Sequence, residues 1–418
     1  MKKNIISNKI LKNFTHLLFS NVLILMLPFI YYPYLIRAIG TENYGNVVYT
    51  QSIYFLLSIV IQFGFSISAT KQIAIYRENK RRLSTIFYSI CLIKLLLFLI
   101  VILPSILILY FLFLRENINI ILHLSCIIYL IGDLFFINWF FQGVEKMLYV
   151  SLGTLVYKLL LLSSVFLFVS TKDDYIIYTM IFSVCYIIGN FSLFILAIIK
   201  FRLTSFILNK KLIFDLFSDS WQFFLSRLSS VFVERFNILL LGYSSEKEFV
   251  AYYDLATKLV GIAQLPFNLF NQAFYPNATR EKNIKKVYNV IKVLSLVSIL
   301  GIILSYVLTP YIIKIYVGDS MIDTAPIINI LIFSILINIP SHFIGNCLLV
   351  PFGLSRDFKN SVIHCTVLYT PILIVLHALN SLTIYTLSIT YLFYLFIILL
   401  YRISIWNTYL NKNEKSIM

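Results

Sequence analysis

The amino-acid sequence predicts an all-α integral membrane protein with about twelve transmembrane helices in two six-helix bundles. The first observation is composition, because 60% of the 418 residues are hydrophobic, only 12% are charged, and the mean hydropathy is +0.89. Soluble domains rarely combine such values. The second observation is a regular series of apolar windows, and the third is the concentration of basic residues on alternate connecting segments.

A helix needs about 20 apolar residues to cross roughly 30 Å of hydrocarbon. Windows of this kind lie at about residues 14–38, 44–70, 84–111, 118–142, 147–170, 174–199, 217–242, 248–275, 287–309, 324–350, 360–380 and 383–407. The first has no small-residue cleavage site behind it, so we expect a retained helix rather than a signal peptide. The longest connecting segment, from Lys200 to Phe214, divides the chain into an N-terminal bundle, residues 1–205, and a C-terminal bundle, residues 206–418.

Positively charged loops stay on the cytoplasmic side of a membrane. With a cytoplasmic N-terminus, 23 Lys and Arg residues fall on cytoplasmic segments and 5 on the opposite loops. The cytoplasmic set comprises Lys2, Lys3, Lys9, Lys12, Lys71, Arg77, Lys80, Arg81, Arg82, Lys146, Lys200, Arg202, Lys210, Lys211, Arg280, Lys282, Lys285, Lys286, Arg356, Lys359, Arg402, Lys412 and Lys415. The opposite set comprises Arg37, Arg115, Lys172, Lys247 and Lys314. This asymmetry predicts an even number of spans with both termini in the cytoplasm.

Composition and motifs also argue against several classes of function. Lys and Arg outnumber Asp and Glu by 34 to 18, but they lie in short segments between apolar runs, which argues against a nucleic-acid partner. The five cysteines lie inside apolar runs without a CxxC pair or a histidine at metal-ligand spacing, so we expect no metal site. Because the chain has neither GxxxxGK[ST] nor HExxH, we expect no cofactor and no enzyme activity. The energy source is then an ion gradient or downstream consumption of the substrate.

Two long apolar helices around a short polar turn, Gly242 to Glu248, carry an unusual number of charges. The charged residues within them are Arg227, Glu234, Arg235, Asp254 and Lys258. An ionised side chain at the middle of the hydrocarbon costs about 3 kcal/mol on insertion scales, so several on one hairpin indicate a paired or water-filled setting. We interpret the chain as a transporter whose charges face what it moves.

Helical spacing leaves two interpretations of these charges open. Arg227 and Glu234 are seven residues apart and share a helix face. Asp254 and Lys258, at i and i+4, are able to pair along their own helix. The charges therefore either form internal ion pairs that lock the bundle or line a polar path.

Three further charges stand alone in apolar helices of the first half. Lys94 and Lys158 either line a cavity or extend their ammonium groups toward a membrane interface. Asp133 either holds a proton or pairs with Lys158.

The two halves share a weak internal likeness. In each, a Gly ends one helix, an acidic and aromatic turn opens the next, and a basic segment follows: LIRAIG, TENYGNVVY and ATKQIAIYR in the first half, NILLLG, YSSEKEFVAYY and ATREKNIKK in the second. The likeness reflects either a parallel duplication of a six-helix unit or the chance similarity of apolar helices with short loops.

Four segments occur in order along nearly the whole chain: LPFIYYPYLIRAIGTENYGNVVYTQSIYFLLSIVIQFGFSISATKQIA, NWFFQGVEKM, SWQFFLSRLSSVFVERFNILLLG and NCLLVPFGLSRDF. Together they resemble the Wzx-type polysaccharide flippases of the multidrug/oligosaccharidyl-lipid/polysaccharide exporter superfamily. WFFQGVEKM and LIRAIGTENYG are the more specific parts of the likeness.

The resemblance implies two six-helix bundles around a central cavity. It also implies that the chain moves a polyprenyl-diphosphate-linked oligosaccharide repeat unit, of O-antigen or capsule type, by alternating access. The movement would run from the cytoplasmic to the outer leaflet of a bacterial inner (plasma) membrane, beside a polysaccharide polymerase and a chain-length regulator. Three alternatives stay open: a drug/ion antiporter of the extruder branch, a lipid II flippase, and the membrane polysaccharide polymerase, whose chemistry normally requires a larger outer loop.

A lipid-linked diphosphate would suit the buried charges. Positive groups offset the desolvation of a phosphate, and the planar donors of Arg match its oxygens. The candidate substrate-binding cations are Arg227, Lys258, Arg235, Lys94 and Lys158. The candidate groups for coupling to an ion or a proton are Glu234, Asp254 and Asp133.

Overall fold

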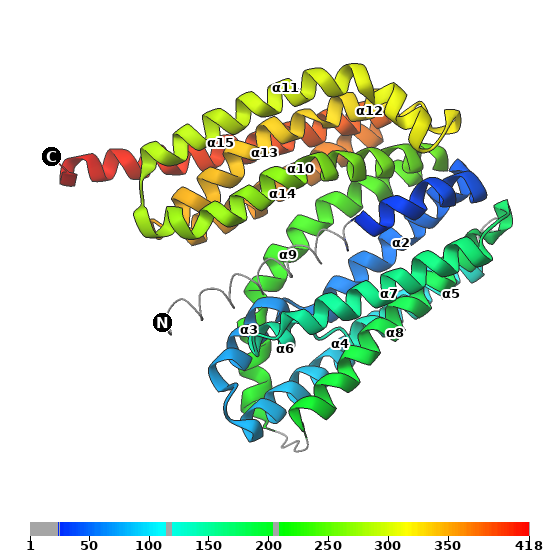
Figure 1. Cartoon of the computed structure of the whole chain (residues 1–418), viewed down its shortest axis with the longest axis horizontal. Helices are drawn as coiled ribbons and strands as arrows, with labels where there is room; N and C mark the ends of the chain where they lie inside the picture. Colours follow the sequence, from blue (N-terminus) through cyan, green and yellow to red (C-terminus); the bar gives the residue numbers. More distant parts are fainter. Residues whose placement is uncertain (1–23, 25, 114–118, 204–208, 418) are drawn as a thin grey trace, which may run out of the picture. The chain divides into compact units, whose positions relative to one another are not determined.

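The computed structural model describes residues 24, 26–113, 119–203 and 209–417, and the regular structure in these ranges is helical (Figure 1). The chain separates into two compact units, Met1–Leu228 and Ser229–Met418, which meet within one long helix. The functional division predicted between residues 205 and 206 stays a prediction.

Unit 1 contains a helix over residues 26–39 and seven further α-helices before the chain enters α9. These are α2 (Thr41–Gln62), α3 (Phe65–Tyr76), α4 (Lys80–Phe113), α5 (Ile120–Leu134), α6 (Asn138–Gly143), α7 (Met147–Phe168) and α8 (Tyr175–Phe201), with a short 3-10 turn, η1, at Lys172–Asp174. Within this unit α8 lies between α5 and α7 and packs against both (Figure 1). Residues 14–23 of the first predicted window lie outside the described residues.

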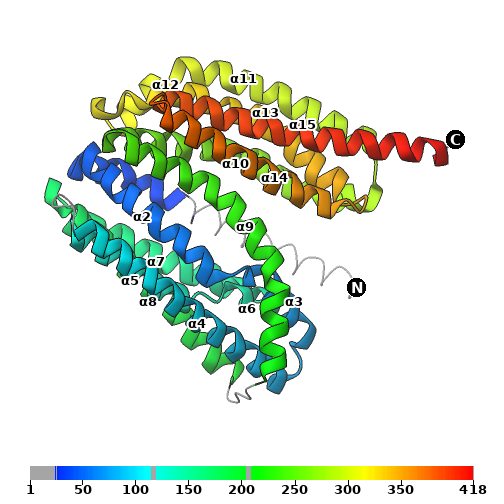
Figure 2. The same cartoon turned by 180° about the vertical axis from the view of Figure 1, so that it is seen from behind.

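The long helix α9 (Lys210–Ser244) carries the chain from unit 1 into unit 2. Unit 2 continues with α10 (Lys247–Glu281), α11 (Ile284–Tyr316), η2 (Asp319–Met321), α12 (Thr324–Leu331), α13 (Phe333–Phe343), the π-helical turn η3 (Ile344–Leu349), α14 (Ser355–Ala378) and α15 (Ile384–Ile417). Here α15 packs against α12, α13 and α14, and α10 packs against α12 (Figure 2).

Each of the twelve predicted windows coincides with helix in the described residues, which confirms the all-α membrane class. Nine helical stretches of the described chain are long and apolar enough to cross a membrane. Neither α9 nor α10 is among those nine, although each is 35 residues long. Charged and polar residues lower the hydropathy of these two helices, in agreement with the unusual polarity predicted for the central hairpin.

Three of the predicted spans are interrupted in ways that the apolar windows do not indicate. The second is divided between α2 and α3, the fourth between α5 and α6, and the tenth among α12, α13 and η3. Backbone outside a helix is tolerated at membrane depth only where protein or water satisfies its polar groups. The breaks between α2 and α3 and between α5 and α6 therefore mark places where side chains or close packing must support the backbone. In the tenth span, Ile332 keeps helical dihedral angles and its N–H bonds the Ile328 carbonyl, so the helix changes there only into the π-helical turn η3.

The break between α2 and α3 consists of two successive left-handed residues. Phe63 has φ 39° and Gly64 has φ 72°. A bulky residue in this conformation is strained and persists only when its surroundings hold it. The Phe63 ring stacks on Phe217 and Phe224 of α9, with ring centroids 4.4 and 4.7 Å apart respectively. Aromatic stacking on α9 thus holds the strained turn.

Close helix packing surrounds the same break. A Cβ atom on Gly64 would lie 2.7 Å from the backbone nitrogen of Phe224 and 2.8 Å from the carbonyl oxygen of Ser220. One turn further, the hydroxyl groups of Ser68 and Ser220 form a hydrogen bond of 2.7 Å. Small residues that allow backbones to approach, together with hydroxyl bonds between helices, are typical of association in membranes. The first half of α9 is therefore joined to α3 by Gly64 and Ser68.

We expect Gly64→Ala to lower the free energy of unfolding by about 2 kcal/mol or more, because the added methyl group meets backbone and the residue must keep a left-handed φ. The measurement is the thermal unfolding midpoint of the detergent-purified chain. Gly301→Ala is the matched control, since no atom lies within 4 Å of a Cβ there. Equal midpoints for the two variants would contradict the packing argument.

Candidate functional site

A buried carboxylate lies at the break between α5 and α6. Asp133 is fully buried, and its Oδ1 accepts hydrogen bonds from Gln62 Nε2 and the Tyr186 hydroxyl, both 2.9 Å long. Its Oδ2 is buried with no hydrogen-bond partner among the described residues. A buried charge requires pairing to be tolerated, so a compensating cation is expected nearby.

That cation is Lys94, at the middle of α4. Its side chain is 1% exposed, and Nζ donates to the carbonyl oxygen of Phe136 at 2.7 Å, within the α5–α6 break. Lys94 and Asp133 attract each other electrostatically. Lys94 thus both satisfies a carbonyl group released by the helix interruption and balances the carboxylate.

Gln62 connects this pair to α9. It is the last residue of α2, and while its amide nitrogen donates to Asp133, its Oε1 accepts from Arg227 Nη2 at 3.4 Å, near the upper limit of a hydrogen bond. Arg227 is exposed, in contrast to Lys94. The helices α2, α4, α5, α8 and α9 therefore contribute to one polar cluster in unit 1: Gln62, Lys94, Asp133, Tyr186 and Arg227.

A narrow pocket opens beside this cluster. Its volume is about 10 Å³, close to that of one water-sized atom. It is lined by Gln62, Gly64, Phe65, Ser66, Lys94, Phe136, Trp139 and Arg227. The Trp139 side chain is 2% exposed, and its indole Nε1 is buried without an acceptor among the described residues. The lining thus includes the donors of Lys94, Trp139 and Arg227 beside apolar groups such as Phe65 and Phe136.

The charges of the central hairpin form a second cluster, in unit 2. Lys258 Nζ lies 2.7 Å from Asp254 Oδ2, so the predicted i, i+4 ion pair is present. Arg235 attracts Glu234 electrostatically, although it repels Lys258. Two cations and two carboxylates therefore compensate one another along α9 and α10.

Neutral polar residues continue this second cluster across unit 2. Asn237 of α9 accepts from the Tyr369 hydroxyl at 2.9 Å and donates to the Tyr253 hydroxyl oxygen at 3.1 Å. All three side chains are buried. The network joins α9, α10 and α14, and both the amide oxygen and the amide nitrogen of Asn237 are hydrogen-bonded.

Arg402, one of the basic residues assigned from the sequence to the last cytoplasmic segment, is buried in the structure. It lies within α15, is 5% exposed, and donates to the Ser341 carbonyl at 2.9 Å and to the hydroxyl groups of Ser341 and Ser361. Its guanidinium also covers the Phe358 ring at 4.4 Å. The side chain supports the backbone close to the π-helical turn η3, a role that spacing along α15 does not indicate.

The structure also separates the candidates of the first half. Lys158 donates to the carbonyl oxygen of Ile24 in the first helix at 2.8 Å, while the cation beside Asp133 is Lys94. The alternative that Asp133 pairs with Lys158 is therefore wrong. Sequence reasoning also passed over Gln62, Tyr186 and Trp139; the polar Gln62 before a Gly in an apolar window is the one signal that could have indicated the break.

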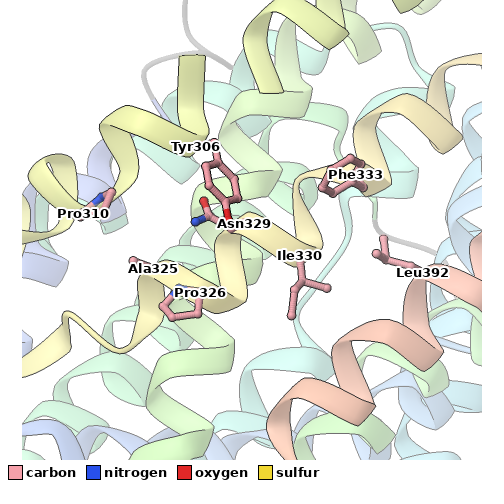
Figure 3. Close-up of a pocket in the computed structure, with 8 residues that line it drawn as sticks. All are labelled: Tyr306, Pro310, Ala325, Pro326, Asn329, Ile330, Phe333 and Leu392. Carbon is pink, nitrogen blue, oxygen red and sulfur yellow. The ribbon is translucent and has the colours of Figure 1, made fainter. Parts of the chain in front are cut away.

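A larger pocket in unit 2 has a different character. It has a volume of about 610 Å³ and is formed by α11, α12, α13 and α15 (Figure 3). Its walls are Tyr306, Pro310, Ala325, Pro326, Asn329, Ile330, Phe333 and Leu392. These are mostly apolar side chains without a charge, so this pocket is not suited to an anionic or cationic group.

Within the described residues, no cluster of His, Cys, Asp or Glu has a geometry that could hold a metal ion. The five cysteines are free thiols.

Comparison with known proteins identifies a family that matches the sequence and solved structures that share the fold. The sequence profile of a family described as polysaccharide biosynthesis protein matches residues 10–282. A candidate O-antigen transporter of Escherichia coli (strain K12) is 25% identical over 315 residues, which cover 73% of this chain and 75% of the relative. A candidate O-antigen transporter of Shigella dysenteriae is 28% identical over 277 residues, 62% of this chain and 67% of the relative.

Solved structures share the fold at low sequence identity. The inward-facing conformation of a multidrug resistance transporter of the MATE family matches with a TM-score of 0.69 and 14% identity over 94% of this chain and 99% of the other. The lipid II flippase MurJ, in an inward closed conformation, matches with a TM-score of 0.67 and 14% identity over 92% of this chain and 86% of the other. These relatives are described as transporters or a flippase rather than enzymes, as expected for this chain.

We expect Lys94→Met to reduce the amount of folded protein strongly, because it leaves the buried Asp133 carboxylate without its compensating charge, at a cost of about 3–5 kcal/mol. The double variant with Asp133→Asn should recover most of this loss, since no uncompensated charge remains. Thermal unfolding and the yield of monodisperse protein measure both effects.

Lys158→Met provides the matched control for this pair. It removes a half-buried ammonium group that binds a backbone carbonyl, so Asp133→Asn should not rescue it. Rescue of Lys158→Met, or strictly additive losses for Lys94→Met and Asp133→Asn, would argue against the Lys94–Asp133 pairing.

Proposed function

Because the chain belongs to the polysaccharide biosynthesis protein family, we propose that it is a flippase for polyprenyl-diphosphate-linked oligosaccharide repeat units, of O-antigen or capsule type. It moves them from the cytoplasmic to the outer leaflet of a bacterial inner membrane by alternating access. The two relatives described as candidate O-antigen transporters support the substrate class. The fold shared with MurJ supports a transporter architecture.

The observation that carries the proposal is the cationic cluster at the interrupted helices of unit 1. Lys94 and Arg227 meet there with one carboxylate, Asp133, so their formal charges leave an excess of one positive charge. Ionisable residues within membrane helices commonly mark a substrate or ion path. An excess of positive charge at helix breaks suits a diphosphate better than a cationic drug.

We assign roles to the candidate residues on this basis. Arg227 and Lys94 bind the diphosphate, with Lys258, Arg235 and Lys158 as further cations along the path. The carboxylates Glu234, Asp254 and Asp133 couple transport to an ion or a proton. Asp254 and Lys258 form an ion pair in this structure, so each is available to substrate only when the pair opens.

The proposed partners are a polysaccharide polymerase and a chain-length regulator, which would receive the repeat units on the outer side. The proposed topology places both termini in the cytoplasm, and the burial of Arg402 leaves the excess of basic residues on the cytoplasmic segments in place.

Reporter fusions test this topology. Fusions after Lys80, Arg202 and Lys286 should behave as cytoplasmic, and fusions near Asn43, Lys172 and Ser245 as external. These positions lie at or near helix ends in the structure. A reproducible inversion at any of the six would refute the orientation or the number of spans.

In a strain that lacks this protein, we expect repeat units on their lipid carrier to accumulate in the inner leaflet while synthesis continues. Surface polysaccharide should fall and return on complementation with the wild-type chain. Normal surface polysaccharide in a deletion strain without a second flippase would refute the proposed function.

Complementation with Arg227 variants makes the test residue-specific. Arg227→Ala should abolish export at near-normal abundance, because its partner Gln62 is neutral and no buried acid is left unpaired. Arg227→Lys should retain part of the export, since the charge survives without the bidentate geometry.

The ion-pair interpretation of Arg227 makes a different prediction. If Arg227 acts only as the partner of Glu234, Arg227→Ala should lose abundance and Arg227→Ala/Glu234→Gln should recover both abundance and export. Full export by a well-expressed Arg227→Ala chain would remove the substrate-binding role.

A further inference from the structure

We propose that the break between α2 and α3 is an oxygen-sized anion hole that receives one phosphoryl oxygen, with the rest of the phosphoryl group held at its mouth by Arg227. The inference rests on the proposed function and assigns this subsite to Trp139, Lys94 and the first turn of α3, in addition to Arg227.

The first contribution comes from backbone. The α3 helix is 12 residues long, begins at Phe65, and has no side-chain cap at its N-terminus. The first amide groups of a helix have no intrahelical acceptor, and together with the helix dipole they favour an anion. Phe65 and Ser66, the first two residues of α3, both line the pocket. Interrupted transmembrane helices use such ends to hold anionic groups of substrates.

The second contribution is a buried donor without an acceptor. The Trp139 indole is nearly fully buried, lines the pocket and has no hydrogen-bond partner for Nε1 among the described residues. An unsatisfied buried donor costs about 1–3 kcal/mol. An acceptor atom in the pocket, such as a phosphoryl oxygen, would remove this cost.

The third contribution is positive charge, which a buried lysine and an exposed arginine supply to the lining of the pocket. Lys94 is buried at 1% exposure, and its ammonium group has three N–H donors, of which Phe136 accepts one. Arg227 and Ser66 line the same pocket and are exposed. The opposing charge is Asp133, which is not part of the lining and which Lys94 offsets.

The size of the pocket decides which part of the ligand enters. A volume of about 10 Å³ admits one atom of the size of water but not a whole phosphate. One oxygen is therefore inserted between Trp139, Lys94 and the α3 amides, and the phosphorus with its other oxygens stays at the mouth near Arg227. The donors of Arg match such an outer group.

The test uses the full chain in phosphatidylcholine nanodiscs, with Trp221 and Trp406 changed to Phe so that Trp139 is the one remaining tryptophan of three. Polyprenyl diphosphate should shift the Trp139 emission in a saturable way. Inorganic diphosphate shows whether the phosphoryl group suffices without the lipid tail. Sodium acetate and sodium chloride at equal ionic strength test whether the site prefers phosphoryl oxygens.

Two variants test the donors through ligand-induced thermal stabilisation, which needs no tryptophan signal. Trp139→Phe in the otherwise wild-type chain should weaken binding about tenfold, as expected for one hydrogen bond to a charged group. Ser66→Asp should weaken it by about tenfold or more through like-charge repulsion. An acid in the first helical turn favours the helix, so folding should be retained.

The controls separate charge from shape. Ser66→Asn, the neutral counterpart of Ser66→Asp, should bind like the wild type, and so should Arg82→Gln, which alters an exposed cation stacked on Tyr76 away from the pocket. Binding that is insensitive to Trp139→Phe and Ser66→Asp would show that the pocket holds a water molecule only. An equal response to acetate or chloride would also overturn the phosphoryl assignment.

Measurements of export distinguish a failure of the proposed subsite from a failure of the proposed function. If wild-type export is confirmed but both variants bind polyprenyl diphosphate normally, the subsite is wrong and the proposed function stands. If polyprenyl diphosphate does not bind and deletion leaves surface polysaccharide unchanged, the proposed function itself is wrong.

Discussion

The requirement that every polar backbone group in a hydrocarbon layer finds a partner governs the polar features of this protein. The chain interrupts two apolar spans of unit 1, and each interruption releases groups that a continuous helix would satisfy. In unit 1, Lys94 bonds the Phe136 carbonyl between α5 and α6, and the strained turn at Phe63 is held by stacking on α9. A buried lysine needs a counter-charge, which Asp133 supplies, and Asp133 in turn fixes Gln62. The polar cluster thus follows from the backbone breaks.

Unit 2 meets the same requirement in another way. Arg402 reaches across from α15 to the Ser341 carbonyl and to two hydroxyl groups close to the π-helical turn. Isolated π-helical turns occur frequently at functional sites, where they alter the register of one helix face. Here the arginine is engaged by protein oxygens and an aromatic ring, whereas in unit 1 the indole of Trp139 keeps a donor with no acceptor. Because this donor also lines a pocket, we place a ligand subsite there.

The charges of the central hairpin fit both interpretations given above, because some form internal pairs and one is accessible to a ligand. The Asp254–Lys258 pair and the attraction between Arg235 and Glu234 make most of the hairpin charges self-compensating. Arg227, about two turns before Glu234 and Arg235 on the same helix, binds a neutral glutamine. One helix therefore carries charges that stabilise unit 2 and a cation that is open to a ligand in unit 1.

The sequence by itself determined the all-α membrane class, the helical windows and the Asp254–Lys258 pair, because apolar length and i, i+4 spacing are local properties of a chain. The tertiary structure decided the rest. Asp133 takes Lys94 rather than Lys158 because α4 and α5 pack together, a contact between residues 39 positions apart that no local pattern contains. Gly64 ends a helix because α9 lies against it, and Arg402 is buried because α13 and α14 supply its acceptors. The unpaired Trp139 donor likewise exists only in the folded chain, where burial removes the water that would otherwise satisfy it.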